Sequence, residues 1–207
     1  MKVLSVNLSV VRSIEFEGRT IETGIYKEPV SDRVHVTAQG LEGDQQADLR
    51  VHGGEFKAVY GYGANSYAWW EEQLDRELPW GMFGENLTIA DLDDNDVSVG
   101  DVFSIGDVKL EAVQPRMPCS KLAMRFNDPG IVKRFLDAAR PGVYFRVLES
   151  GTVRVGDDCV AVHRESTRFS IPALAQLMYA NPRDPELVQR ALQLPALPPD
   201  LAKSLKE

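Results

Sequence analysis

The residue types that could carry out chemistry gather in a short loop around Cys119, where the sequence reads QPRMPCSKL from Gln114 to Leu122. Two prolines in this loop fix φ and restrict the backbone, so that a side chain held there is pre-oriented. Arg116 and Lys121 lie within a few residues, and nearby cations favour the thiolate, which is the form of cysteine that binds metals. Most isolated cysteines are small, buried and inert. Because this loop is polar and cationic instead, we interpret Cys119 as functional.

A second group of candidate residues surrounds the pair Gly53 and Gly54. Glycines allow the backbone to approach a ligand closely, and Arg50, His52 and Lys57 supply hydrogen-bond donors for an anion. A hairpin turn with solvated basic residues is the alternative interpretation.

A third group lies in the segment FGENLT, residues 83–88. Asn86 offers both a donor and an acceptor, which is what recognition of a heterocycle edge requires. Glu85 could serve as a proton donor if it is desolvated. A turn that enters a strand is the alternative for the whole segment.

The distribution of charge favours a local anion site. The net charge of −8 argues against a general nucleic-acid binder, since no basic excess would hold a phosphate backbone. Between residues 109 and 125, however, four basic residues accompany the single acid Glu111. Such an island in an acidic protein indicates a local anion site, with cations scattered over a solvated face as the alternative. The sequence contains no P-loop, HExxH or CxxC motif, so a P-loop ATPase, a zincin and a zinc ribbon lack support.

The cysteine content and the apolar runs bear on the compartment. Cys159 lies in an alternating run over 155–162 and is expected in the core. Two cysteines are too few for a disulfide framework, which favours a reduced, cytoplasmic setting. No apolar run approaches the roughly 20 residues of a membrane span, and residues 1–11 alternate like an opening strand rather than a signal peptide.

The elements that must position these groups are mostly strands up to residue 165. Alternating runs cover 1–11, 20–26, 97–103, 108–113, 143–148 and 159–163, with shorter runs at 58–62 and 153–155 and Gly-Asp turns between several of them. This pattern predicts a mainly antiparallel β-barrel or sandwich. Two helices are expected on its outside, one from Asn65 or Ser66 to Leu78 and one from Asn127 or Asp128 to Pro141.

The sequence changes character after residue 165. Three short helices are expected, from Ser170 to Ala180, from Asp184 to Leu192 and from Pro199 to about Leu205. We therefore divide the chain into a barrel domain over 1–165 and a small three-helix domain over 166–207. The helical part is too short to bury much core alone, so we expect it to pack on the barrel or on a second subunit, which makes a homodimer plausible.

The motifs in this order resemble the MOSC domain, named for the C-terminal domain of molybdenum cofactor sulfurases. The residues that carry the resemblance are GLEGD at 40–44, HGG at 52–54, GENLT at 84–88, VGD at 99–101 and PRMPCSKL at 115–122. The resemblance spans roughly residues 1–165, and the three-helix tail is similar to that of the stand-alone YiiM-like subgroup.

The resemblance implies an antiparallel MOSC-type β-barrel with peripheral helices, whose cleft holds the pterin-based molybdenum cofactor. Cys119 matches the family cysteine that binds molybdenum beside the two dithiolene sulfurs of the cofactor. The cofactor's phosphate and pterin would lie among basic residues and glycines, with Asn86 at the ring edge and His52 as a candidate catalytic proton carrier. The basic residues and glycines are Arg50, Gly53, Gly54, Lys57, Arg116 and Lys121.

The function that the resemblance implies is reduction of N-hydroxylated compounds such as 6-hydroxylaminopurine. Removal of oxygen from N–OH is a two-electron reduction that side chains cannot perform alone. The sequence shows no flavin or nicotinamide fingerprint, so a separate reductase is expected to supply the electrons. Two alternatives stay open. The protein could carry the cofactor or transfer sulfur through Cys119, or it could be a binding barrel in which Cys119 is structural.

Overall fold

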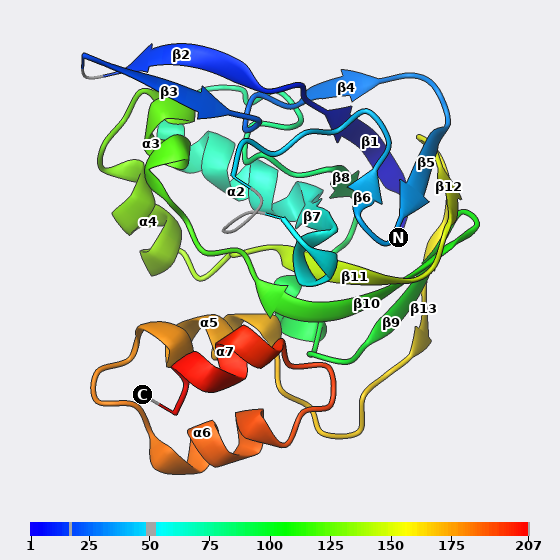
Figure 1. Ribbon diagram of the computed structural model, residues 1–207, viewed down its shortest axis with the longest axis vertical. Helices are drawn as coiled ribbons and strands as arrows, with labels where there is room; N and C mark the ends of the chain where they lie inside the picture. The colour runs from blue at the N-terminus through cyan, green and yellow to red at the C-terminus, as the bar shows by residue number, and fades with distance from the viewer. Residues whose placement is uncertain (17, 49–52, 207) are drawn as a thin grey trace.

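An eight-stranded sheet forms the centre of the molecule in the computed structural model, which describes residues 1–16, 18–48 and 53–206 (Figure 1). The strand order is β13-β9-β10-β11-β7-β8-β1-β4. Neighbouring strands are antiparallel except for β7 and β8, which are parallel. In chain order the strands are β1 (Val3–Leu8), β4 (Glu28–Val30), β7 (Val59–Gly63), β8 (Leu87–Ile89), β9 (Val102–Ile105), β10 (Val108–Pro115), β11 (Val143–Glu149) and β13 (Cys159–His163).

The sheet curls back on itself without forming a continuous barrel. An isolated bridge joins Lys2 to Asp158, which lie next to the first residues of β1 and β13. Among the described residues, β13 and β4 remain the edges of the ladder. The expectation of a mainly β, mainly antiparallel fold is therefore confirmed, whereas closure into a barrel is not confirmed.

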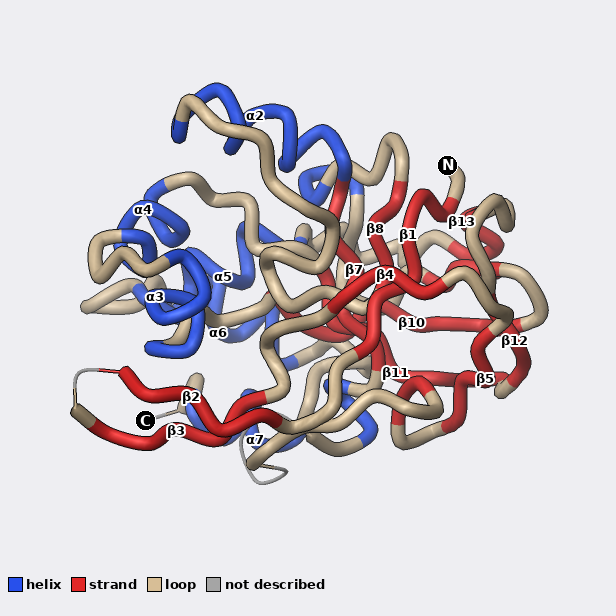
Figure 2. Tube along the Cα trace, turned by 90° about the horizontal axis from the view of Figure 1, so that it is seen from above, coloured by secondary structure: helices blue, strands red, loops and turns tan. Residues whose placement is uncertain are grey.

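Two smaller sheets complete the β structure. One contains β12 (Gly151–Val153), β5 (Val34–Thr37) and β6 (Gly40–Leu41) in that order. The other is the hairpin of β2 (Arg12–Phe16) and β3 (Arg19–Thr23), which extends outward past α3 (Ser120–Phe126) in both views (Figures 1 and 2). The chain that leaves this hairpin returns to β4 along the candidate site described below.

Three helices cover one side of the sheet around a second, aromatic core. They are α2 (Ala64–Leu74), α3 and α4 (Ile131–Asp137). Tyr67 and Trp70 are buried in this core. The helix expected to reach Leu78 ends earlier, because Asp75 adopts a left-handed φ of 50° that terminates α2. Helix α3 was not predicted, since its first residue follows Cys119 without any side-chain cap.

The three C-terminal helices are α5 (Ile171–Tyr179), α6 (Pro185–Leu192) and α7 (Pro199–Ser204), as expected. The side chains of Ser170 and Asp184 accept hydrogen bonds from the first turns of α5 and α6, which explains where these helices begin. Their buried side chains belong to the same apolar core as the sheet. The helical part therefore packs on the sheet and does not need a second subunit to bury its apolar faces.

The remaining short elements are two 3₁₀ helices, η1 (Glu55–Lys57) and η2 (Asp94–Asp96). Within the described ranges, no helix has the length and apolar character that crossing a membrane would require.

The connection to the helical part is anchored by Asp101, which is fully buried. Its carboxylate accepts hydrogen bonds at 2.8 Å from Arg164 and Arg168 and from the backbone N–H groups of Ser98 at 3.0 Å and Glu165 at 2.8 Å. Burial raises the pKa of Asp101, but these four hydrogen bonds outweigh it and hold the pKa below its usual range. The predicted Gly-Asp turn is thus also the attachment point of the chain that leads to α5.

We expect Asp101→Asn to lower the free energy of unfolding by about 2–3 kcal/mol at neutral pH, since two half-exposed arginines lose their charged partner. A carboxylate whose folded pKa is lowered stabilises the fold above its unfolded pKa of about 3.9 and loses that contribution as the pH falls through the lowered value. The difference between wild type and variant should therefore shrink in acid. Denaturant unfolding of wild type and variant at pH 7 and pH 3 measures this difference in the free energy of unfolding. An equal difference at the two pH values would contradict the role of the Asp101 charge.

Candidate functional site

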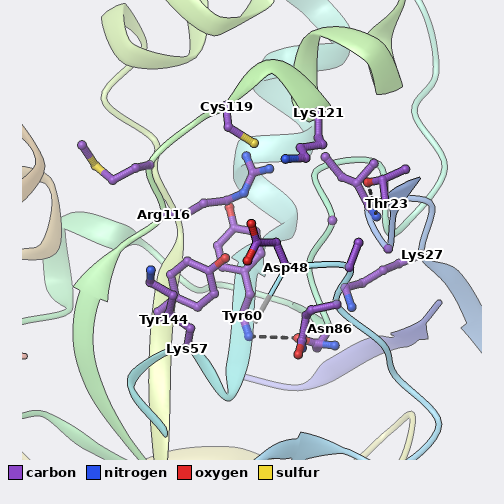
Figure 3. A pocket seen from close by; sticks show the side chains of 16 residues that line it. Thr23, Lys27, Asp48, Lys57, Tyr60, Asn86, Arg116, Cys119, Lys121 and Tyr144 are labelled. Atoms are coloured by element: carbon purple, nitrogen blue, oxygen red, sulfur yellow. Dashed lines mark hydrogen bonds between the residues drawn. The ribbon is translucent and has the colours of Figure 1, made fainter. Parts of the chain in front are cut away.

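A pocket of about 670 Å³, including solvent at its mouth, brings together groups from distant parts of the sequence (Figure 3). Its walls come from the end of β3, the approach to β4, the strands β7 and β11, and the loop between β10 and α3. The polar and charged side chains that line it include Thr23, Lys27, Asp48, Lys57, Tyr60, Asn86, Arg116, Cys119, Lys121 and Tyr144.

Cys119 reaches this pocket from the end of the proline-containing loop. Strand β10 ends at Pro115 as expected, and Cys119 is the residue that precedes α3. Figure 3 shows its sulfur pointing into the pocket, toward the same region as the side chains of Lys121 and Arg116. Cys119 is half-buried, so its sulfur combines access from solvent with cationic neighbours. Electropositive, partly exposed surroundings of this kind are typical of reactive cysteines.

Arg116 is a buried cation with an unused donor. Its side chain is only 6% exposed, and its Nη1 atom has no hydrogen-bond partner. Its guanidinium lies 5.5 Å from the ring centre of Tyr60 and 5.6 Å from that of Phe135. Burial lowers the pKa of Arg116, but attraction to Tyr60, Tyr144 and Cys119 outweighs it and raises the pKa above its usual value. Since buried donors are nearly always paired, this one indicates a place for a ligand with acceptor atoms.

Lys27 is a second buried cation, and the sequence analysis did not identify it as a site residue. It forms an ion pair with Asp44, and both side chains are almost fully buried. Burial lowers the pKa of Lys27 in spite of this partner. Asp44 also accepts from Asn86 Nδ2 at 2.9 Å and from the Ser9 N–H at 2.9 Å. The GLEGD and GENLT motifs therefore meet through the hydrogen bond between Asp44 and Asn86.

Asn86 lines the pocket, but most of its amide is engaged inside the protein. Its Oδ1 accepts from the Tyr60 N–H at 3.1 Å, and its Nδ2 donates to Asp44 and, at 3.4 Å, to the carbonyl of Asn7. An amide oxygen has two lone pairs, so one acceptor position of Asn86 is left for a ligand. Its main effect on the site is to hold the pocket wall in place.

Glu85 is desolvated, yet its carboxylate does not line the pocket. It is fully buried and accepts from Tyr67 Oη at 2.6 Å, from Thr88 Oγ1 and the Gly81 N–H at 2.8 Å, and from the Phe83 N–H at 3.2 Å. Burial raises the pKa of Glu85, while hydrogen bonds led by that from Tyr67 lower it in part. The carboxylate faces the aromatic core and has the role of a structural acceptor.

The structure places the candidate residues around Gly53 and Gly54 in three different ways relative to the pocket. Lys57 lines the pocket, and burial lowers its pKa, with partial compensation by Asp200 of α7. Gly53 and Gly54 are described but are not among the residues that line the pocket. Arg50 and His52 lie outside the described residues. Gly84 does line the pocket; its φ of 76° favours glycine, and a Cβ atom at this position would lie only 3.0 Å from the Ile25 side chain.

Tyr60 and Tyr144 were not predicted as site residues because each belongs to a strand that reads as core. The register of β7 and β11 pairs them directly, and their ring centres lie 5.0 Å apart. Burial raises the pKa of both phenols, and the charge of Arg116 opposes this in each case. Cys159, by contrast, is 2% exposed, and burial raises its pKa to about 12, which confirms it as a core residue.

The donor set of the pocket fits a phosphate-bearing pterin cofactor. Its lining contains four basic side chains, one thiol and one carboxylate, that of Asp48. The Nη1 atom of Arg116 has no hydrogen-bond partner and could donate to an acceptor atom of a ligand. In the described parts of the chain, no group of three or more His, Cys, Asp or Glu side chains could hold a metal.

Comparisons with known proteins agree with the arrangement of the chain. A model of the MOSC domain matches residues 48–160, and a model of the YiiM-like, 3-alpha helix domain matches residues 170–207. The protein YflK of Bacillus subtilis (strain 168) is 40% identical over 195 residues, which cover 94% of this chain and 88% of that protein. A Gibberella moniliformis protein named Reductase is 33% identical over 86% of this chain, but the match covers only 32% of that protein. The crystal structure of YiiM from Geobacillus stearothermophilus is similar with a TM-score of 0.84 and 30% identity, covering 99% of this chain and 97% of that one.

Proposed function

Because the chain belongs to the MOSC domain family and ends in a YiiM-like three-helix domain, we propose that it is a molybdenum-cofactor-dependent reductase of N-hydroxylated compounds. The observation that carries the proposal is the position of Cys119 beside the buried Arg116, whose Nη1 has no partner, in a pocket whose charged lining is four cations and one carboxylate. The name of the partly matching Gibberella moniliformis protein, Reductase, supports the reaction class.

In this proposal the cofactor supplies a molybdenum centre that can accept oxygen in a two-electron reduction, which side chains alone cannot do. Cys119 would be the single protein ligand to the metal. Arg116, Lys121 and Lys57 would bind the phosphate and the pterin oxygens, because charged donors form the stronger hydrogen bonds to anions. Asn86 would offer its remaining acceptor position to the ring edge. Roles for Arg50, Gly53 and Gly54 in cofactor binding, and for His52 in proton transfer, remain predictions.

The substrate and the electron source are also part of the proposal. An N-hydroxylated base such as 6-hydroxylaminopurine would lose its oxygen as water, with two electrons from a separate reductase and two protons. Tyr60, which is buried, and the half-buried Tyr144 would help to keep the inner wall of the pocket free of bulk water, since their ring centres lie 5.0 Å apart beside Arg116. The low-dielectric wall would strengthen the attraction between the guanidinium and an anionic group in the pocket.

The test is a steady-state assay with 6-hydroxylaminopurine and a purified reductase, on protein expressed in a host that makes the cofactor. We expect turnover that scales with molybdenum content and disappears when the cofactor is stripped. Stripped protein with full activity would overturn the cofactor dependence. Loaded protein that shows no turnover but delivers the cofactor to an acceptor apoenzyme would instead support a carrier function.

A further inference from the structure

A second pocket lies between the central part of the molecule and the C-terminal helices. It has about 900 Å³, including solvent at its mouth, and is lined mainly by apolar residues of α4, α5 and the segment that follows α4. Figures 1 and 2 both place α4 beside α5. The lining residues that matter here are Arg116, Phe135, Pro141, Ala175, Gln176 and Tyr179.

This second pocket shares a wall with the pocket of Cys119. Arg116 lines both, so the two pockets adjoin at its side chain. Tyr60 of the first pocket donates a hydrogen bond of 2.9 Å to the carbonyl of Pro141, which lines the second. Burial raises the pKa of Tyr179, the charge of Arg116 lowers it in part, and Cys119 adds to the rise, so the α5 phenol lies within electrostatic range of both groups. A ligand in the second pocket would therefore lie close to the reactive end of the first.

The lining indicates what kind of molecule fits. The carboxylate of Asp137 is paired with Lys133 at 2.5 Å and does not offer an unpaired charge for a cation. Phe135 is only 2% exposed, so the aromatic surface that suits a flat ring comes mainly from Tyr179, which is 46% exposed. Nη1 of Arg116 carries two N–H groups and neither has a partner, so one can serve the cofactor and the other an acceptor atom at one end of that ring.

We propose that the pocket between α4 and α5 binds the ring of a flat, uncharged aromatic or heteroaromatic substrate. The N–O group of that substrate points past Arg116 toward Cys119, and the amide of Gln176 faces the ring edge. Helix α5 thereby makes the C-terminal domain a wall of the substrate site that selects for aromatic substrates. The role as substrate site rests on the proposed function, whereas the binding of the ring does not.

The first test fills the pocket with Ala175→Phe, since Ala175 is a half-buried residue of α5 in the lining. The variant Ala68→Phe is the control, because Ala68 is exposed on α2 away from both pockets. We compare kcat/KM for 6-hydroxylaminopurine with kcat/KM for the ringless N-hydroxyurea. The ratio should fall about tenfold in Ala175→Phe, equivalent to about 1.4 kcal/mol, and stay at the wild-type value in Ala68→Phe. A ratio unchanged in Ala175→Phe would overturn the proposal.

The second test measures binding alone and is independent of turnover. Saturation-transfer NMR with adenine, which carries the ring without the N–O group, should show binding to wild type and to Ala68→Phe and its loss in Ala175→Phe. If wild type reduces neither substrate, the proposed reductase function fails while this measurement still decides the pocket. Adenine that does not bind wild type, or binds Ala175→Phe equally well, would overturn the pocket assignment.

Discussion

Replacing Cys119 with alanine should give a folded protein that contains at least about tenfold less molybdenum than wild type. The side chain is half-buried at the start of α3 and does not belong to either apolar core, so its loss removes little packing. Among the described residues that line the pocket, Cys119 is the only cysteine, so no second thiol there could replace it. Loss of hydrogen bonds that merely orient a ligand already lowers metal affinity about 10–100-fold, and loss of the ligand itself should cost no less. Metal analysis together with pterin content measures the effect.

The control for this experiment is Cys159→Ala, which removes the thiol of the second cysteine from a buried position in β13. It should lose some stability but keep its molybdenum. Pterin retained by Cys119→Ala without molybdenum would show that the basic residues bind the cofactor independently of the thiol. Equal molybdenum in Cys119→Ala and wild type would contradict ligation by Cys119. The absence of molybdenum from wild type would favour a carrier or a binding barrel.

The parts of the fold that the sequence predicts well are those specified by neighbouring residues. The C-terminal helices begin at caps and prolines within a few positions of one another, and the loop of Cys119 is marked by its own prolines. Strand β9 illustrates the limit. It begins at Val102 rather than Val97, because Gly100 turns the chain at a φ of 93° and Asp101 is held by arginines more than sixty residues away. Local alternation carries no information about such a partner.

The candidate site shows the same division between local and distant causes. Cys119, Arg116 and Lys121 come from one segment whose composition alone indicates chemistry. Lys27 joins them only because a buried partner, Asp44, is brought in from another loop, and Tyr60 faces Tyr144 only through the register of two strands. These pairings depend on how the sheet is assembled, so single-sequence reasoning has no period or motif from which to infer them.

Glu85→Ala should be the most destabilising single change among the residues around the site, lowering the free energy of unfolding by about 3–5 kcal/mol. Four buried donors lose their acceptor at once, two of them hydroxyls and two backbone N–H groups. The hydroxyl of Tyr67 belongs to α2 and that of Thr88 to β8, so the carboxylate joins the aromatic core to the sheet. Glu85→Gln keeps one acceptor oxygen but turns an amide donor toward other donors, so it should retain only part of the stability.

Glu72→Ala is the matched control, since Glu72 is an exposed glutamate on α2, and it should change the free energy of unfolding by no more than about 0.5 kcal/mol.

The stabilising effects of Glu85 and Asp101 should depend on pH in opposite directions. Because burial raises the folded pKa of Glu85, its contribution to stability is largest below the usual glutamate pKa of about 4.3 and declines as the pH rises toward the raised value. The difference between wild type and Glu85→Ala should therefore shrink from pH 4 to pH 8, whereas that for Asp101→Asn should grow from pH 3 to pH 7. Denaturant unfolding across this pH range measures both differences in the free energy of unfolding. If Glu85→Ala lost as little stability as the control, the Glu85 carboxylate would not hold the loop before β8, and water or nearby carbonyls would replace it.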